Sequence, residues 1–126
     1  MFLHYWDSSS GDGYSLDEDF PSKITDIYKA NHWMGKQCES HVPVVATWTM
    51  GDGTKIAKIE RDPDSQGGIV GILVLSKTRK AGQNIMDRLG LGEPSDDLED
   101  EALDKWYDSQ TEVDPGKIFE LTEDED

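Results

Sequence analysis

The spacing of apolar residues along the chain predicts several strands and a small number of helices. Strand-like runs occupy residues 2–6, 42–50 and 54–60, and the run IVGILVLS at 69–76 is apolar on both alternating faces, as a central strand would be. The GDG triplet at 51–53 separates two of these runs and predicts a hairpin turn. DPDSQGG at 62–68 predicts a second reversal, and Ile118–Leu121 is a candidate closing strand.

Helical spacing is found in three places. The first helix is expected from Ile24 to about Gly35, with Ser22 as its candidate N-cap. The second covers residues 81–89 and is followed by Gly90, which suits the position after a helix end. The third covers 95–108 and is rich in carboxylates. This order of elements predicts an α+β fold: one small antiparallel sheet of about four strands, covered on one face by two or three helices, one of them an acidic C-terminal helix.

The length of the chain bounds its organisation. At 126 residues it is the size of one domain, and we expect residues 1–126 to form a single unit. Residues 7–19 carry Ser, Gly and Asp with little to bury and are expected to form a flexible acidic loop. Residues 122–126 (TEDED) are expected to be a frayed acidic tail.

Charge is distributed unevenly along the chain, and this distribution says more about the type of partner than the net charge does. The net charge is −15, yet residues 23–92 carry ten Lys and Arg against seven acids. Residues 93–126 carry fifteen acids against two lysines. A field of this sign repels bare nucleic acid and anionic membrane and attracts a basic protein surface. Halophilic adaptation is a weaker explanation, because the acids cluster and lysine outnumbers arginine by nine to three.

The acidic helix has a regular geometry. At about 100° per residue, Asp104 and Asp108 each fall within roughly 20° of Asp97, while Leu98, Ala102 and Trp106 lie on the opposite side. Trp106 is therefore expected to anchor the helix on the sheet. Repulsion between like charges at i,i+4 costs a helix about 0.2–0.5 kcal/mol per pair. An anchored stripe of one sign is what a binding surface for a cationic partner requires, although a solvated helix face is an equally simple explanation.

The predicted function follows from this stripe. We expect a small, non-enzymatic inhibitor, of a phage or mobile-element type, that binds the basic surface of a nucleic-acid-handling protein by imitating DNA or RNA, as an anti-restriction or anti-CRISPR protein would. One alternative is an immunity protein that neutralises a cationic nuclease toxin. Another is a nucleic-acid-binding module whose basic middle is autoinhibited by the acidic flanks. The residues expected to bind the partner are Asp96, Asp97, Glu99, Asp100, Glu101, Asp104, Asp108 and Glu112.

Other motifs give weaker signals. His32, Cys38 and His41 are possible zinc ligands, but a structural site needs four, and the spacing is not that of a zinc finger. The loop from Ser8 to Asp19 resembles an EF-hand loop only superficially. Lys77, Arg79 and Lys80 precede a helix without P-loop glycines, and we expect them to pair with acids of the C-terminal third. We therefore predict no catalytic residue, no metal and no cofactor.

Location is inferred from two further features. The start of the chain has no basic segment followed by a long apolar one, and its longest apolar run is too short to span a bilayer. Cys38 is the one cysteine, so no disulfide can form within the chain, which suits a reducing compartment. We expect a cytoplasmic protein, in the host cytoplasm if it is encoded by a phage. Trp33 and Tyr107 are candidate contact residues if they are exposed.

Overall fold

The computed structural model describes residues 1–8, 15–37, 41–61, 68–91, 99–102 and 105. Five strands form one sheet: β1 (Phe2–Asp7), β2 (Ser15–Asp17), β3 (Val44–Thr49), β4 (Lys55–Arg61) and β5 (Ile69–Ser76). Their order is β2-β1-β5-β4-β3, and every neighbouring pair is antiparallel. The expectation of an α+β fold with an antiparallel sheet is confirmed. The expected number of about four strands was too low, because Ser15–Asp17, within the stretch predicted to be a loop, pairs with β1 at the sheet edge.

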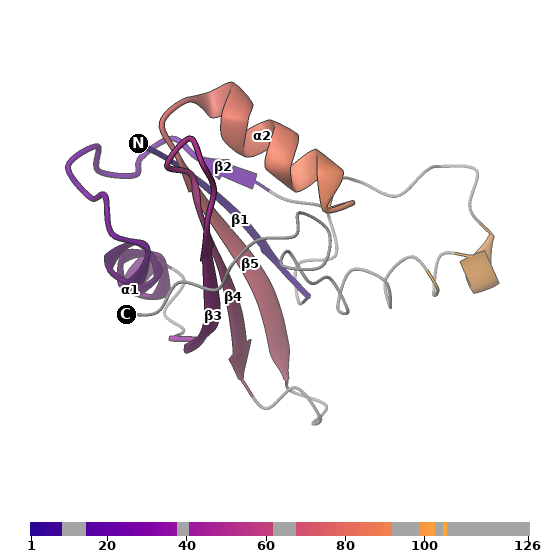
Figure 1. Ribbon diagram of the computed structural model, residues 1–126. Coiled ribbons are helices and arrows are strands. Elements are labelled where there is room, and N and C mark those ends of the chain that lie inside the picture. The colour runs from indigo at the N-terminus through magenta and orange to yellow at the C-terminus, as the bar shows by residue number, and fades with distance from the viewer. Residues whose placement is uncertain (9–14, 38–40, 62–67, 92–98, 103–104, 106–126) are drawn as a thin grey trace.

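Two helices cover the sheet, one on each face (Figure 1). The helix α1 (Ile27–Gln37) packs with Leu73 and Leu75 of β5, whereas α2 (Arg79–Arg88) packs with Ile72 and Val74 of the same strand. The prediction that helices cover one face was therefore wrong. The physical reason is visible in β5 itself: both of its alternating faces are apolar, so both need cover from water.

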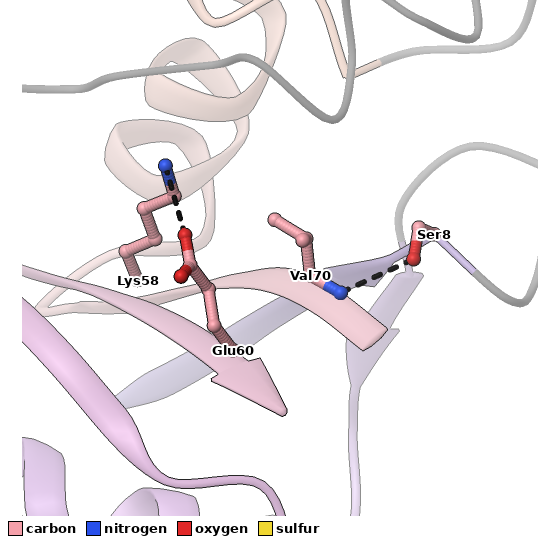
Figure 2. Close-up of polar contacts among 4 residues, drawn as sticks. All are labelled: Ser8, Lys58, Glu60 and Val70. Atoms are coloured by element: carbon pink, nitrogen blue, oxygen red, sulfur yellow. Dashed lines mark hydrogen bonds and ion pairs between the residues drawn. The ribbon is translucent and has the colours of Figure 1, made fainter. Parts of the chain in front are cut away.

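The central strand β5 was correctly identified from its sequence. Six of its residues, from Gly71 to Ser76, are buried. It pairs with β1 over Phe2–Asp7 and with β4 over Lys55–Arg61. Beyond the end of β1, the Ser8 N–H donates to the Val70 carbonyl at 2.8 Å, and the Val70 N–H donates to the Ser8 hydroxyl at 3.1 Å (Figure 2). Ser8 thus extends the β1–β5 pairing by one residue.

The hairpin between β3 and β4 forms where the GDG triplet predicts it. The Met50 N–H donates to the Thr54 carbonyl at 2.8 Å, and the Asp52 carboxylate accepts from the Thr54 N–H at 2.9 Å. Hydrogen bonds from the Thr54 backbone N–H and side chain favour the charged carboxylate and hold the pKa of Asp52 below its usual value. A shift in register between Val44 and Ala46 places a bulge near the start of β3, which is an edge strand.

The start of α1 differs from the sequence prediction. The Asp26 carboxylate accepts hydrogen bonds from the Tyr28 and Lys29 N–H groups, at 2.8 and 3.1 Å, and the helix begins at Ile27. Asp26 is therefore the N-cap, and the prediction of Ser22 was wrong. A carboxylate at this position satisfies two free N–H groups and also faces the positive end of the helix dipole. The Asn31 side-chain amide donates to the Val42 carbonyl at 2.8 Å, which ties α1 to the segment just before β3.

Both ends of α2 are closed by local sequence signals. Thr78 is the N-cap, and its hydroxyl accepts from the Ala81 N–H at 3.1 Å. At the other end, Gly90 adopts a positive φ of 75°, which favours glycine, and its N–H donates to the Asp87 carbonyl. The Leu91 N–H donates to the Met86 carbonyl, and the Leu91 side chain is fully buried. The predicted end of this helix at Gly90 is confirmed.

Candidate functional site

The predicted acidic site lies only partly within the described residues. Glu99, Asp100 and Glu101 are all exposed, and Asp100 and Glu101 have helical backbone. Together they line a shallow hollow of about 480 Å³. The other predicted partner-binding residues and the predicted anchor lie outside the described residues: Asp96, Asp97, Asp104, Asp108, Glu112 and Trp106. The acidic C-terminal helix, with its continuous stripe of carboxylates, therefore stays a prediction.

The three described carboxylates are accessible to a partner. Glu99, Asp100 and Glu101 form no ion pair with any residue that the structure describes. By contrast, Glu60 is paired with Lys58 at 3.2 Å on β4 (Figure 2), and Glu18 with Arg79 at 3.6 Å. Exposed carboxylates that form no ion pair with a described residue can attract a cationic surface.

The basic cluster at the start of α2 (Lys77, Arg79 and Lys80) lies near two acids that the structure describes. The Arg79 guanidinium pairs with Glu18 and lies 5.8 Å from the centroid of the Phe2 ring. Lys77 lies near Asp52 and contributes to the lowered pKa of that carboxyl, after its hydrogen bonds to Thr54. Within the described residues, the segment before α1 and the hairpin turn partly neutralise this cluster. The expected pairing with acids of the C-terminal third stays a prediction, because most of that segment lies outside the described residues.

The histidines of the H-x5-C-x2-H motif are brought together. His32 and His41 stack with ring centroids 5.5 Å apart and an angle of 27° between their planes. Cys38 lies outside the described residues. Among the residues that are described, no group of three His, Cys, Asp or Glu side chains is arranged to hold a metal ion.

The described ends of the calcium-like loop form sheet contacts and a turn. The Ser8 hydroxyl accepts from Val70, and the Asp17 carboxylate accepts from the Asp19 N–H at 3.0 Å, which is an Asx turn. Residues 9–14 lie outside the described part of the loop.

A groove on the outer side of α1 was not anticipated as a site. Its volume is about 420 Å³. Six residues line it: Ile24, Tyr28, Lys29, His32, Trp33 and Lys36. The sequence did mark Trp33 as a candidate contact residue, but the groove depends on Tyr28, His32 and Lys36 repeating every four residues along one side of a helix. This four-residue spacing is the sequence signal from which the groove residues could have been grouped, given the bounds of the helix.

The buried polar side chains in the described part of the chain are His4, Thr47, Thr54 and Ser76. Burial lowers the pKa of the His4 imidazole, and the nearby Arg79 charge lowers it further, while a hydrogen bond with the Arg79 backbone opposes the shift. His4 packs beneath α2 against Gly82. Its location is that of a core residue between a strand and a helix.

Two further findings concern membrane-spanning helices and similarity to known proteins. Within the described residues, no helix combines the length and the apolar character needed to cross a bilayer. Comparison with protein-family models, curated proteins and solved structures finds no match to this chain.

Proposed function

We propose that the protein is a small non-enzymatic inhibitor that binds the basic surface of a nucleic-acid-handling protein by imitating the charge of DNA or RNA. The proposed class is that of the anti-restriction and anti-CRISPR proteins of phages or mobile elements. The protein would act in the host cytoplasm. The binding surface would be the acidic segment that includes Glu99, Asp100 and Glu101, extended by the carboxylates at 96, 97, 104, 108 and 112.

The observation that carries the proposal is the exposure of Glu99, Asp100 and Glu101 without an ion pair to any described residue. They belong to a segment, residues 93–126, with fifteen acids and two lysines. Such a segment steers a cationic partner toward itself and raises the rate of association, most strongly at low salt. Successive acids on one helix face rise about 5–6 Å, and a DNA strand carries one phosphate per about 3.4 Å, so a groove built for phosphates can accept them.

The competing explanation is a solvated acidic face that binds nothing. The two explanations predict different results: a defined binding surface depends on the position of the charges, whereas a solvated acidic face depends only on their number. We therefore propose to measure displacement of a fluorescent 20-base-pair DNA duplex from a panel of restriction, CRISPR and recombination nucleases, with the full chain as competitor. Glu99→Gln/Asp100→Asn/Glu101→Gln removes three charges from the proposed surface. Glu123→Gln/Asp124→Asn/Glu125→Gln removes the same number from the terminal tail.

The expected result is displacement of the duplex from at least one nuclease, weakened about tenfold or more by the first variant and much less by the second. Circular dichroism should be unchanged in the first variant, since the three substituted side chains at 99–101 are exposed. We expect the same of the tail variant. Equal effects of the two variants would contradict a defined surface. Tight binding without displacement of the duplex would instead indicate an immunity protein that binds its nuclease outside the catalytic groove.

A further inference from the structure

The outer side of α1 forms a groove that neither the core nor the acidic segment explains. The helix packs on the sheet through Ile27, Ala30 and Met34, which are buried. Exposed residues of the same helix, Tyr28, Lys29, His32 and Lys36, lie on its outer side. Tyr28, His32 and Lys36 form one row and Lys29 and Trp33 the next, and together with Ile24 they line the groove of about 420 Å³.

The floor of this groove is aromatic and held in place. Tyr28 is 44% exposed, one of two large apolar side chains exposed to this degree in the described part of the chain. Trp33 is half-buried and packs edge-on against Phe20, with ring centroids 5.2 Å apart and planes at 82°. A fixed tryptophan beside an exposed tyrosine loses little side-chain entropy on binding, which is why such residues dominate binding energy at protein interfaces.

The rim of the groove is positive. Lys29 and Lys36 are exposed and form no ion pair with any residue that the structure describes, although acids outnumber bases 27 to 12 in the whole chain. No Asp or Glu occurs within α1. The carboxylate of Asp26, just before the helix, accepts two backbone N–H groups. His32 stacks on His41 at the same surface.

We propose that this groove binds an acidic peptide segment of a partner protein, with one aromatic or aliphatic side chain seated between Tyr28 and Trp33 and carboxylates beside Lys29 and Lys36. Seven residues of helix separate the two lysines, a rise of about 10.5 Å. An extended peptide covers that distance in about three residues. The preferred segment is therefore acid-x-apolar-acid, with acids three residues apart.

A peptide is favoured over nucleic acid as the occupant. The whole chain has a net charge of −15, which repels a polyanion at long range but has a much smaller effect on a short segment that carries a few charges. Among the described residues that line the groove, Lys29 and Lys36 are the two lysines, few for a phosphate backbone. This surface attracts anions, whereas the acidic segment attracts cations, so the two proposals stand or fall separately.

The test uses the full chain and a fluorescein-labelled peptide, GSEDAFDEGS, measured by fluorescence anisotropy, with amide chemical shifts followed by NMR. Two matched peptides replace Phe by Gly (GSEDAGDEGS) or the four acids by amides (GSQNAFNQGS). The groove variants are Lys29→Glu/Lys36→Glu and Tyr28→Ala. The control variant is Lys77→Glu/Lys80→Glu, which makes the same change of charge at exposed positions beside α2, on the other face of the sheet.

The expected result is saturable binding with shifts confined to residues 24–36 and 41. Lys29→Glu/Lys36→Glu should weaken binding at least tenfold relative to Lys77→Glu/Lys80→Glu, and Tyr28→Ala at least threefold. Both matched peptides should bind at least fivefold more weakly. The proposal is overturned if GSEDAFDEGS shows no binding at 1 mM, if the groove and control variants bind it equally, or if an eight-nucleotide oligothymidine binds the groove more tightly. Self-association through the groove, seen by sedimentation and abolished by Tyr28→Ala, would also overturn it in favour of a second copy.

Discussion

Gly82 of α2 lies directly over the imidazole of His4 in β1. A Cβ at this position would overlap ring atoms Nδ1 and Cε1 of His4 and would stand 2.6 Å from the Ser76 hydroxyl. The absence of a side chain at Gly82 is therefore what lets α2 approach the sheet closely enough to bury both polar residues.

Gly82→Ala should destabilise the protein, against the usual trend for a glycine within a helix. Alanine raises helix propensity by about 1 kcal/mol, but overpacking of a tight interface costs about 1–3 kcal/mol, and here the ring and the strand behind it cannot move freely. Because the contact is very close, we expect the cost to fall in the upper part of that range, for a net loss of about 1–2 kcal/mol in the free energy of unfolding, measured by urea denaturation. Gly51→Ala is the control, since nothing lies within 4 Å of a Cβ there. A more stable Gly82→Ala variant would show that α2 sits farther from β1.

The buried His4 should make the protein less stable in mild acid. Burial lowers the pKa of His4 in the folded state below the value of about 6.5 that it has when unfolded. The unfolded chain therefore binds the extra proton first, so stability is full above about pH 6.5 and falls as the pH drops toward the folded-state pKa. The loss approaches 1.4 kcal/mol per pH unit within that window.

NMR titration of the His4 ring and urea unfolding at pH 7.5 and pH 5.5 check this expectation. The His4→Gln variant, which cannot titrate, should show a smaller difference in stability between the two pH values than the unaltered chain. A ring pKa at or above 6.5 in the folded protein would contradict the assignment of His4 to the core.

Asp26, and not Ser22, should carry the N-cap energy of α1. Asp26→Ala removes the acceptor for two backbone N–H groups and should cost about 0.5–2 kcal/mol of stability. Asp26→Asn keeps the acceptor and should cost less, because only the interaction with the helix dipole is lost. Ser22→Ala, at an exposed position four residues earlier, should change stability by less than about 0.5 kcal/mol. If Ser22→Ala had the larger effect in chemical denaturation, the helix would begin earlier than it does here.

Binding to the proposed nuclease target should depend strongly on salt. Charges exposed to water are screened over about 8–10 Å at physiological ionic strength and over about 3 Å at 1 M. We expect the affinity measured by the duplex-displacement assay to fall steadily between 50 and 500 mM NaCl, mainly through a slower association rate. Glu99→Gln/Asp100→Asn/Glu101→Gln should show a shallower dependence than the tail variant. An affinity that does not change with salt would indicate that apolar contacts, and not the acidic surface, determine binding.

Local signals were predicted well from the sequence because they depend on residues close together in the chain. The GDG turn, the apolar strand at 69–76 and the end of α2 at Gly90 were all identified correctly. The short strand Ser15–Asp17 was missed, since three residues are too few to establish an alternating pattern and they pair with β1 only at the sheet edge. The first residue of α1 was placed too early, because Ser22 and Asp26 both fit a cap and only the folded chain shows which one accepts the N–H groups.

Of the two candidate sites, one could be predicted from the sequence and the other could not. The separation of a basic middle from an acidic end, and the exposure expected of acids at 99–101, can be read from the order of the residues. The groove on α1 could not, because Ile24 comes from outside the helix and joins the groove residues only after folding. Phe20 and His41 likewise contact the groove residues Trp33 and His32 only in the folded chain.

The sequence by itself determined the strand and helix periods, the turns, the glycine cap and the division of charge, since each of these is set by side chains within a few residues of one another. Only the tertiary structure decided that β1 lies between β2 and β5, that α1 and α2 cover opposite faces, and that Gly82 meets His4. Those outcomes depend on which apolar faces remain uncovered once the strands have paired, and that is a property of the whole sheet and of no single segment.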